Sequence, residues 1–336
     1  MLNWEIKKIL KDKSSILALI LMIVSLLIVG FIKPLLETQN EYFDESKNKY
    51  VIDNRSKEEI ANEKLAIKKE MVKSTIDSPD SDKKLKSISK EKLNLDNGNK
   101  YENVDFYKVF TQRIDFPVSV IIMMIIIVMI MSNLYTDEVV ANVSPIILSS
   151  KQRNKALYSK VIIAILLPIV VYSVYIGATW IITYMQYGAP LNGDLQAYRI
   201  IDMAMAAKSM TINQYVLSKV ITTTLILLGV STVSLLVSFL SDNSIKSISI
   251  SAGFIAVGKV LTQFSFLPKE ILSLLNKGNY IDVITGTSKI SGFYNEQINI
   301  LSKTVDMSNL IIIIYALIAI IGLLGCIYTI KKVLTK

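Results

Sequence analysis

Five long stretches of the chain contain no charged residue, and this pattern constrains the fold more than any other feature of the sequence. The stretches are 19 to 33 residues long and cover residues 14–32, 116–136, 161–193, 220–241 and 307–330. A helix needs about 20 mainly apolar residues to cross the hydrocarbon core of a bilayer. Because 51% of the 336 residues are also hydrophobic, we expect a polytopic helical membrane protein rather than a soluble enzyme, a disordered chain or a disulfide-linked secreted domain.

A sixth apolar stretch, residues 247–268, is interrupted only by Lys259. It can still cross a bilayer if the lysine amine extends to an interface. Six spans place both termini on one side, and the short segments on that side then carry a net charge of +7, against −1 for the segments on the other side. Since short cytoplasmic segments are enriched in lysine and arginine, the sequence predicts six spans with both termini in the cytoplasm.

The predicted fold is all-α, with a small helical ectodomain between the first two spans. The spans are 14–35, 116–136, 161–185, 214–241, 247–266 and 307–330. The other segments are an amphipathic interfacial helix (1–13), an extracellular domain (36–115), a cytoplasmic loop (137–160), outer loops (186–213 and 267–306) and a cytoplasmic tail (331–336). Within the extracellular domain, Ser56 and Glu59 form a capping-box pattern that predicts a helix ending near Ser74, and a second helix is predicted over 83–95.

The residue types that many enzymes need are missing. The chain has no histidine and one cysteine, Cys326, which excludes histidine-based catalysis, an intramolecular disulfide and a cysteine zinc cluster. The segment from Gly253 to Lys259 resembles a phosphate-binding P-loop, but Val260 replaces the serine or threonine that binds Mg²⁺, and the segment lies in a predicted span. We therefore expect no catalytic residue and no metal or cofactor site in this chain.

Two predicted spans carry polar side chains at helical spacing. The residues are Tyr172 and Tyr175 in the third span and Thr224, Ser231, Ser234 and Ser238 in the fourth. Two interpretations are open. The side chains pack between helices and bond to backbone carbonyls, or they line a path for an amphipathic substrate.

Three lysines lie in the outer parts of predicted spans: Lys33, Lys219 and Lys259. They either reach the outer interface independently or form a basic ring at the outer mouth of a translocation path. No acidic residue lies deep in a predicted span, although ion-coupled transporters usually need one. The energy for transport would then come from a partner protein.

The loop between the second and third spans has a distinctive order of residues. An acidic pair, Asp137 and Glu138, is followed by an apolar stretch and by Ser149-Ser150-Lys151-Gln152-Arg153, and Lys160 opens the next span. This order, like the plan of the whole chain, resembles the coupling region of ABC-2-type transporter permeases, with the approximate pattern E-x-x-x-G-[ST]-x-x-x-L-L-S-x-P-x-[ST]-R. The matching residues are Glu138, Leu148, Ser149, Arg153 and Lys160, whereas Asn142 stands in place of the glycine, Lys151 in place of the proline, and Arg153 comes one residue early.

The resemblance implies a non-catalytic permease subunit of an ATP-driven exporter. Two ABC ATPase subunits, which would hold ATP and Mg²⁺, and a second permease chain, identical or paralogous, would be its partners in the bilayer, with no nucleic acid. The ATPase-coupling residues would be Asp137, Glu138, Ser149, Ser150, Lys151 and Arg153. The substrate would be an amphipathic antimicrobial peptide, an antibiotic or a lipid-like molecule, and the membrane a bacterial, Gram-positive plasma membrane. The alternative is a membrane sensor or scaffold whose 36–115 domain binds an extracellular ligand.

Overall fold

The computed structural model describes residues 1–33, 35–44, 48–79, 81–96, 98, 100–264, 266–286, 289–295, 297–300 and 303–334. The fold is mostly helical, with 74% of residues in helices. Six helices are long and apolar enough to cross a membrane, which is consistent with a multi-pass membrane protein. These are α2 (Lys13–Phe31), α6 (Pro117–Val140), α8 (Arg153–Tyr187), α9 (Ile212–Leu240), α10 (Ser244–Leu261) and α13 (Met307–Thr329).

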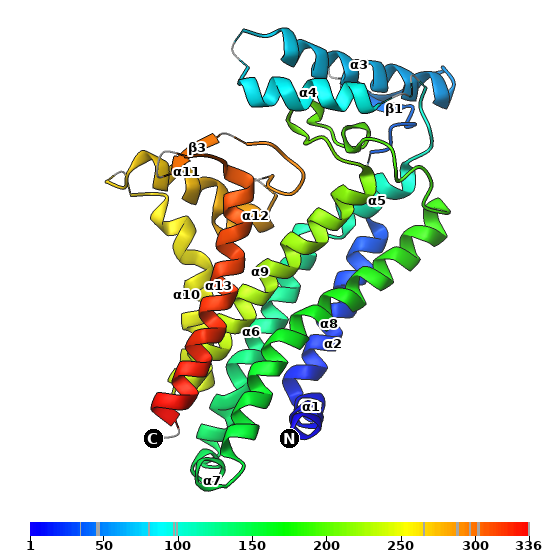
Figure 1. The fold of residues 1–336 in the computed structure, drawn as a ribbon. Coiled ribbons are helices and arrows are strands. Elements are labelled where there is room, and N and C mark those ends of the chain that lie inside the picture. The colour runs from blue at the N-terminus through cyan, green and yellow to red at the C-terminus, as the bar shows by residue number, and fades with distance from the viewer. Residues whose placement is uncertain are drawn as a thin grey trace.

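Helix α9 lies at the centre of this bundle and packs against α6, α8, α10 and α13 (Figure 1). Small residues allow the closest approach, as they do between membrane helices in general. At Gly322 of α13, an added Cβ would lie 2.5 Å from the hydroxyl oxygen of Thr232 on α9. The segment that resembles a P-loop is part of the continuous helix α10, so it does not form a phosphate-binding loop.

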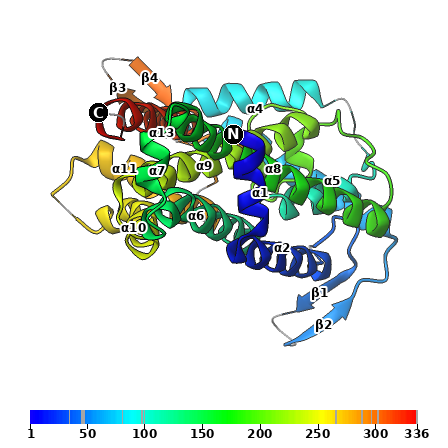
Figure 2. The same cartoon turned by 90° about the horizontal axis from the view of Figure 1, so that it is seen from below.

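One end of the bundle carries both termini and the connection between α6 and α8 (Figure 1). We call it the α7 end, after α7 (Ser144–Ser149). Helix α1 (Leu2–Lys11) lies across this end against α2 and α8 (Figure 2). The chain turns between α1 and α2 at Asp12, whose backbone is extended. The separate N-terminal helix predicted from the sequence is therefore present.

The opposite end carries a helical hairpin of α3 (Lys57–Asp77) and α4 (Lys83–Leu95), and we call it the α3 end (Figure 1). The predicted capping box is confirmed, because Ser56 accepts a hydrogen bond from the backbone of Glu59 and the Glu59 side chain accepts one from the backbone of Ser56. Beneath the hairpin lies α5 (Asp105–Arg113), a helix that runs toward α6. Its aromatic residues Phe106, Tyr107 and Phe110 are buried.

The core beneath the hairpin is built from two segments that are distant in the sequence. Leu65 and Phe106, from residues 36–115, pack with Tyr198, which belongs to the turn η1 (Ala197–Arg199), and with Ala204 of η2 (Ala204–Ala206). Residues 36–115 therefore share this core with residues 186–213, the segment predicted to form an outer loop.

The remaining elements are short. Helices α11 (Lys269–Gly278) and α12 (Tyr280–Ile284) precede the hairpin of β3 (Gln297–Ile300) and β4 (Lys303–Asp306), and a second hairpin pairs β1 (Glu41–Asp44) with β2 (Lys49–Ile52). The expected all-α class therefore misses two antiparallel hairpins. A π-helical turn, η3 (Ile330–Leu334), extends α13, and the tail residue Lys336 lies outside the described residues.

Candidate functional site

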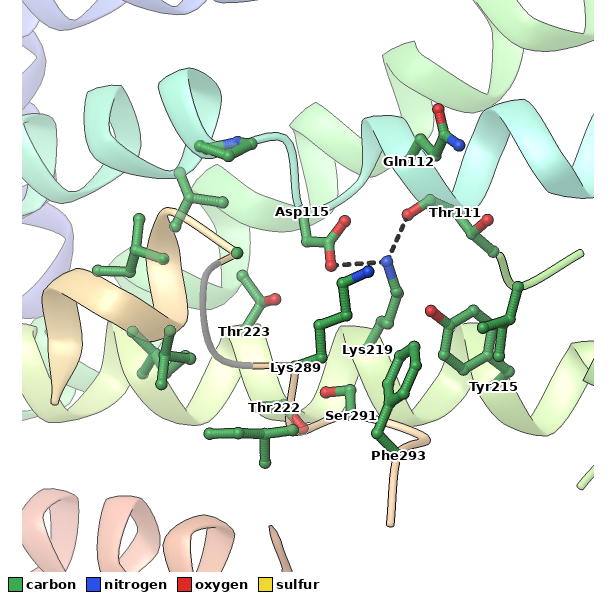
Figure 3. A pocket seen from close by; sticks show the side chains of 18 of the residues that line it. Thr111, Gln112, Asp115, Tyr215, Lys219, Thr222, Thr223, Lys289, Ser291 and Phe293 are labelled. Atoms are coloured by element: carbon green, nitrogen blue, oxygen red, sulfur yellow. Dashed lines mark hydrogen bonds and ion pairs between the residues drawn. The ribbon is translucent and has the colours of Figure 1, made fainter. Parts of the chain in front are cut away.

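A polar cavity of about 260 Å³ lies at the α3 end, between the α5–α6 junction, α9 and the segment that follows α12 (Figure 3). Its polar and aromatic lining comprises Thr111, Gln112, Asp115, Asp202, Tyr215, Lys219, Thr222, Thr223, Lys289, Ser291 and Phe293. The cavity is slightly smaller than the pockets of roughly 300–1,000 Å³ that hold drug-sized ligands. Its size suits a compact polar group.

An ion pair forms one wall of the cavity. The Lys219 ammonium lies 2.7 Å from the Asp115 carboxylate and donates a hydrogen bond of 2.8 Å to the backbone carbonyl of Thr111. It also lies 5.2 Å from the centre of the Tyr215 ring, a favourable cation–π distance. Asp115 occupies this position because the chain breaks between α5 and α6, where Pro117 begins the second helix. The pair joins this break to α9.

Lys289 stands on the other wall and forms no ion pair within 4.0 Å among the described residues, although the charge of Asp202 acts on it at longer range. Its ammonium lies 5.6 Å from the centre of the Phe293 ring and 3.6 Å from the sulfur of Met203. Figure 3 shows the Lys289 and Lys219 side chains pointing toward the same part of the cavity. Since Asp115 already neutralises Lys219, the carboxylate of the described lining that is left to balance Lys289 is Asp202, which also pairs with Lys108.

The second carboxylate of the lining, Asp202, is already used. It forms an ion pair with Lys108, and Lys108 shares the carboxylate of Glu37 with Lys68 at 3.1 and 2.6 Å. Burial lowers the pKa of the Lys68 amine, and the charge of Glu37 opposes that change. This network lies behind the cavity, leaving Asp202 unable to neutralise Lys289 fully. Because Asp202 is shared with Lys108, the cavity keeps an excess of positive charge at Lys289, which favours an anion. Among the described residues, no three acidic or cysteine side chains group as a metal site would require.

The hydroxyl stripe predicted on the fourth span is packed between helices. Ser231 donates to the carbonyl of Ala164 at 2.7 Å, Ser238 donates to that of Ser132 at 2.9 Å, and Ser234 is buried. Thr224 bonds back to Val220, one turn earlier, at 2.7 Å. These contacts support the packing interpretation. The stripe does not line the cavity, but the neighbouring Thr222 and Thr223 do.

The two tyrosines of the third span are also structural. Tyr172 donates to the carbonyl of Ile114 at 3.2 Å, and Tyr175 donates to that of Arg113 at 2.6 Å. Both tyrosines are buried in α8, and both bonds end on the α5–α6 junction. They hold in place the chain break that carries Asp115.

The three outer lysines occupy three different settings. Lys219 lines the cavity, Lys259 forms an ion pair of 2.8 Å with Asp282 of α12, and Lys33 is exposed beyond the end of α2. Lys219 and Lys259 each have their own carboxylate, so these lysines do not act together as a ring of free charges.

A buried ion cluster lies at the α7 end. Lys160 of α8, which is fully buried, contacts Glu138 of α6 at 2.6 Å and Glu5 of α1 at 2.9 Å. Lys8 of α1 contacts the same carboxylate oxygen of Glu138, Oε1, at 2.9 Å. We call these four residues the α1 anchor, because they fasten the N-terminal helix to two helices of the bundle. Glu138, which was expected to face a partner, is 3% exposed.

The rest of the predicted coupling loop is shorter and more exposed than the sequence suggested. Helix α6 continues through Asp137, whose carboxylate accepts a hydrogen bond of 3.2 Å from Ser244 at the start of α10. Helix α8 begins at Arg153, so only residues 141–152 connect the two helices. In this connection Ser149, Ser150 and Lys151 are exposed, and Arg153 is half-buried. Helix α7 itself carries no charge, and the basic residues Lys151 and Arg153 directly follow it, while Glu138 is buried and Asp137 is half-buried.

The sequence reasoning found Lys219 but missed Asp115, Lys289 and Tyr215. Asp115 had a detectable signal, because it directly precedes the predicted span 116–136, whose second residue is proline. Lys289 had none, because its place in the cavity depends on how the segment after α12 folds back over α9.

Comparisons with family models, with curated proteins and with solved structures find no match.

Proposed function

We propose that the chain is the permease subunit of an ATP-driven exporter of the ABC-2 type. The observation that carries the proposal is α7, a short exposed helix held between two long apolar helices, α6 and α8. A soluble ATPase that closes on ATP can move membrane helices only through an exposed element rigidly joined to them. The twelve-residue connection, with α7 inside it, meets that requirement.

The backbone of Asn142 adds support. The family pattern has glycine at this position, and Asn142 has a positive φ of 55°. Glycine adopts this left-handed conformation without strain, and asparagine is the residue that most often replaces it there. The substitution therefore preserves the turn that the family pattern requires at the end of α6.

The proposed contact with the ATPase uses Ser149, Ser150, Lys151 and Arg153. Asp137 and Glu138 act differently, because they join α6 to α10 and to the α1 anchor. Movement imposed on α7 would thus reach α1, α8 and α10 through short polar contacts. The working complex would contain two permease chains and two ATPase subunits in a bacterial plasma membrane, with both termini in the cytoplasm, and would move an amphipathic substrate outward.

The experiment reconstitutes the chain with the ATPase encoded beside it and measures the stimulation of ATP hydrolysis. Charge reversal by Lys151→Glu together with Arg153→Glu is expected to reduce stimulation at least tenfold while the chain still inserts into membranes. Lys332→Glu is the matched control, because Lys332 is exposed in η3 at the same end of the bundle. Equal stimulation in both variants would contradict the assigned contact. Failure of any ATPase to copurify would instead favour the sensor or scaffold function.

A further inference from the structure

An apolar groove of about 460 Å³ lies beside the polar cavity. Its walls are formed by α6 and α10, and its end is formed by α12. The wall residues include Ile121, Met124, Val128, Ile248 and Ala252, and almost none of the lining is polar. Since α6 and α10 are both candidate membrane spans, the groove faces the hydrocarbon of the bilayer.

The groove and the cavity are neighbours. Ile284 of α12 contributes to both, and α6 supplies consecutive residues, with Val120 lining the cavity and Ile121 lining the groove. A molecule with a polar end and an apolar chain could therefore occupy both at once, passing along Ile284.

The depth of the groove fits a lipid chain. Its deepest residue on α6 is Met129, twelve residues after Pro117 at the start of the helix. With a rise of 1.5 Å per residue, that is about 18 Å from the end of the helix. The hydrocarbon core of a bilayer is about 30 Å thick, so the groove runs through one leaflet, with the cavity at the level of that leaflet's head groups.

The charge of the cavity selects the head group. Among the described residues, Lys289 is balanced only in part, by Asp202. Thr223 and Ser291 place hydroxyls in the same lining, whereas the Thr222 hydroxyl already donates to the carbonyl of Ser218. A phosphate accepts hydrogen bonds from ammonium and hydroxyl groups, and charge-assisted bonds of this kind are about twice as strong as neutral ones. A lipid with a net negative head group would balance the charge, whereas a zwitterionic lipid would bring a second cation into the cavity.

We propose that the cavity and the groove together bind one anionic glycerophospholipid of the leaflet on the α3 side. The phosphate lies against Lys289, and one acyl chain lies between α6 and α10. This binding is independent of the proposed export function, because it requires neither an ATPase nor movement of the lipid across the membrane.

The test measures lipid binding to the purified full-length chain by native mass spectrometry. The probes are phosphatidylglycerol and phosphatidylcholine with identical acyl chains. Phosphatidylglycerol is expected to bind at least fivefold more tightly. Phosphatidylglycerol with a photoreactive group on its acyl chain is expected to label α6 within 121–129 and α10 within 248–255. Equal affinity for the two lipids, or labelling elsewhere, would overturn the proposal.

Two pairs of variants separate the head-group contact from the chain contact. Lys289→Gln is expected to remove the preference for phosphatidylglycerol, whereas Lys289→Arg and the exposed control Lys269→Gln retain it. Ala252→Trp is expected to fill the groove and abolish acyl-chain labelling, whereas Val257→Trp, on the same helix but outside the groove, leaves it intact. If Lys289→Gln behaves like Lys269→Gln, or if Ala252→Trp disrupts a dimer instead of lipid labelling, the proposal is wrong.

Discussion

Replacing Lys160 by methionine would remove the central charge of the α1 anchor. The ammonium lies 2.6 Å from Glu138 and 2.9 Å from Glu5, and it also donates to the carbonyl of Leu134 at 3.1 Å. At an effective dielectric constant of about 20, each attraction at about 3 Å amounts to roughly 5 kcal/mol. The cost of burying the ammonium offsets much of this. Removing one partner of a buried ion pair costs about 3–5 kcal/mol, and we expect Lys160→Met to lower the free energy of unfolding by that amount.

The loss of stability should arise mainly from Glu5, which would lose its counter-charge. Glu138 retains Lys8 at 2.9 Å, whereas Lys160 is the only ion-pair partner recorded for Glu5 among the described residues. Glu5 is 1% exposed, and a buried carboxylate without a counter-charge is unfavourable. Exposure of α1 to water would relieve this cost. We therefore expect α1 to detach from the bundle before the bundle itself unfolds.

Two measurements test this reasoning. Denaturation in micelles gives the free energy of unfolding, with the exposed Lys155→Met on the same helix as a control that should change it by less than about 0.5 kcal/mol. Labelling of an Ile9→Cys variant by a water-soluble maleimide reports the detachment of α1, because the native Cys326 is fully buried. Adding Glu5→Gln to Lys160→Met should restore much of the stability. The reasoning fails if Lys160→Met matches its control, or if the double variant is no better than the single one.

Two further predictions concern the packing of the bundle and the α3 end. Gly322→Ala should cost about 1–3 kcal/mol, because its Cβ would meet Thr232 at 2.5 Å; Gly253→Ala, which meets no atom within 4 Å, should be neutral or mildly stabilising in the same thermal melts. Burial lowers the pKa of Lys92 to about 8, although its ammonium donates to the carbonyl of Ala204. Between about pH 8 and 10 the unfolded chain then holds a proton that the folded chain has lost, so stability should rise over that interval. Lys92→Met should remove that part of the rise, and an identical pH profile in both proteins would contradict the assignment.

The predictions that succeeded were those that depend on local sequence. Ser56 and Glu59 cap α3 through residues three apart, and the spans follow from uninterrupted apolar length. The contacts of the candidate sites were harder to predict from the sequence. Glu138 was predicted to lie in the loop after the second span, but it lies within α6, and its burial depends on Lys160 and on α1, which begins more than 100 residues earlier. A pattern within one segment carries no information about such partners.

The sequence by itself predicted a helical membrane protein. A single segment can satisfy all its backbone polar groups in lipid only as a helix, and six stretches of the described chain are long and apolar enough to form such helices. The sequence also predicted the two helices at the α3 end, the first of them from its capping box, whereas their packing against each other comes from the structure. Only the tertiary structure decided that the hydroxyl stripe packs inward, that Lys219 pairs with Asp115, and that Lys289 lacks a carboxylate within 4.0 Å among the described residues. Charge compensation depends on distances of a few ångströms between segments far apart in the chain. Those distances are set by the packing of the whole bundle.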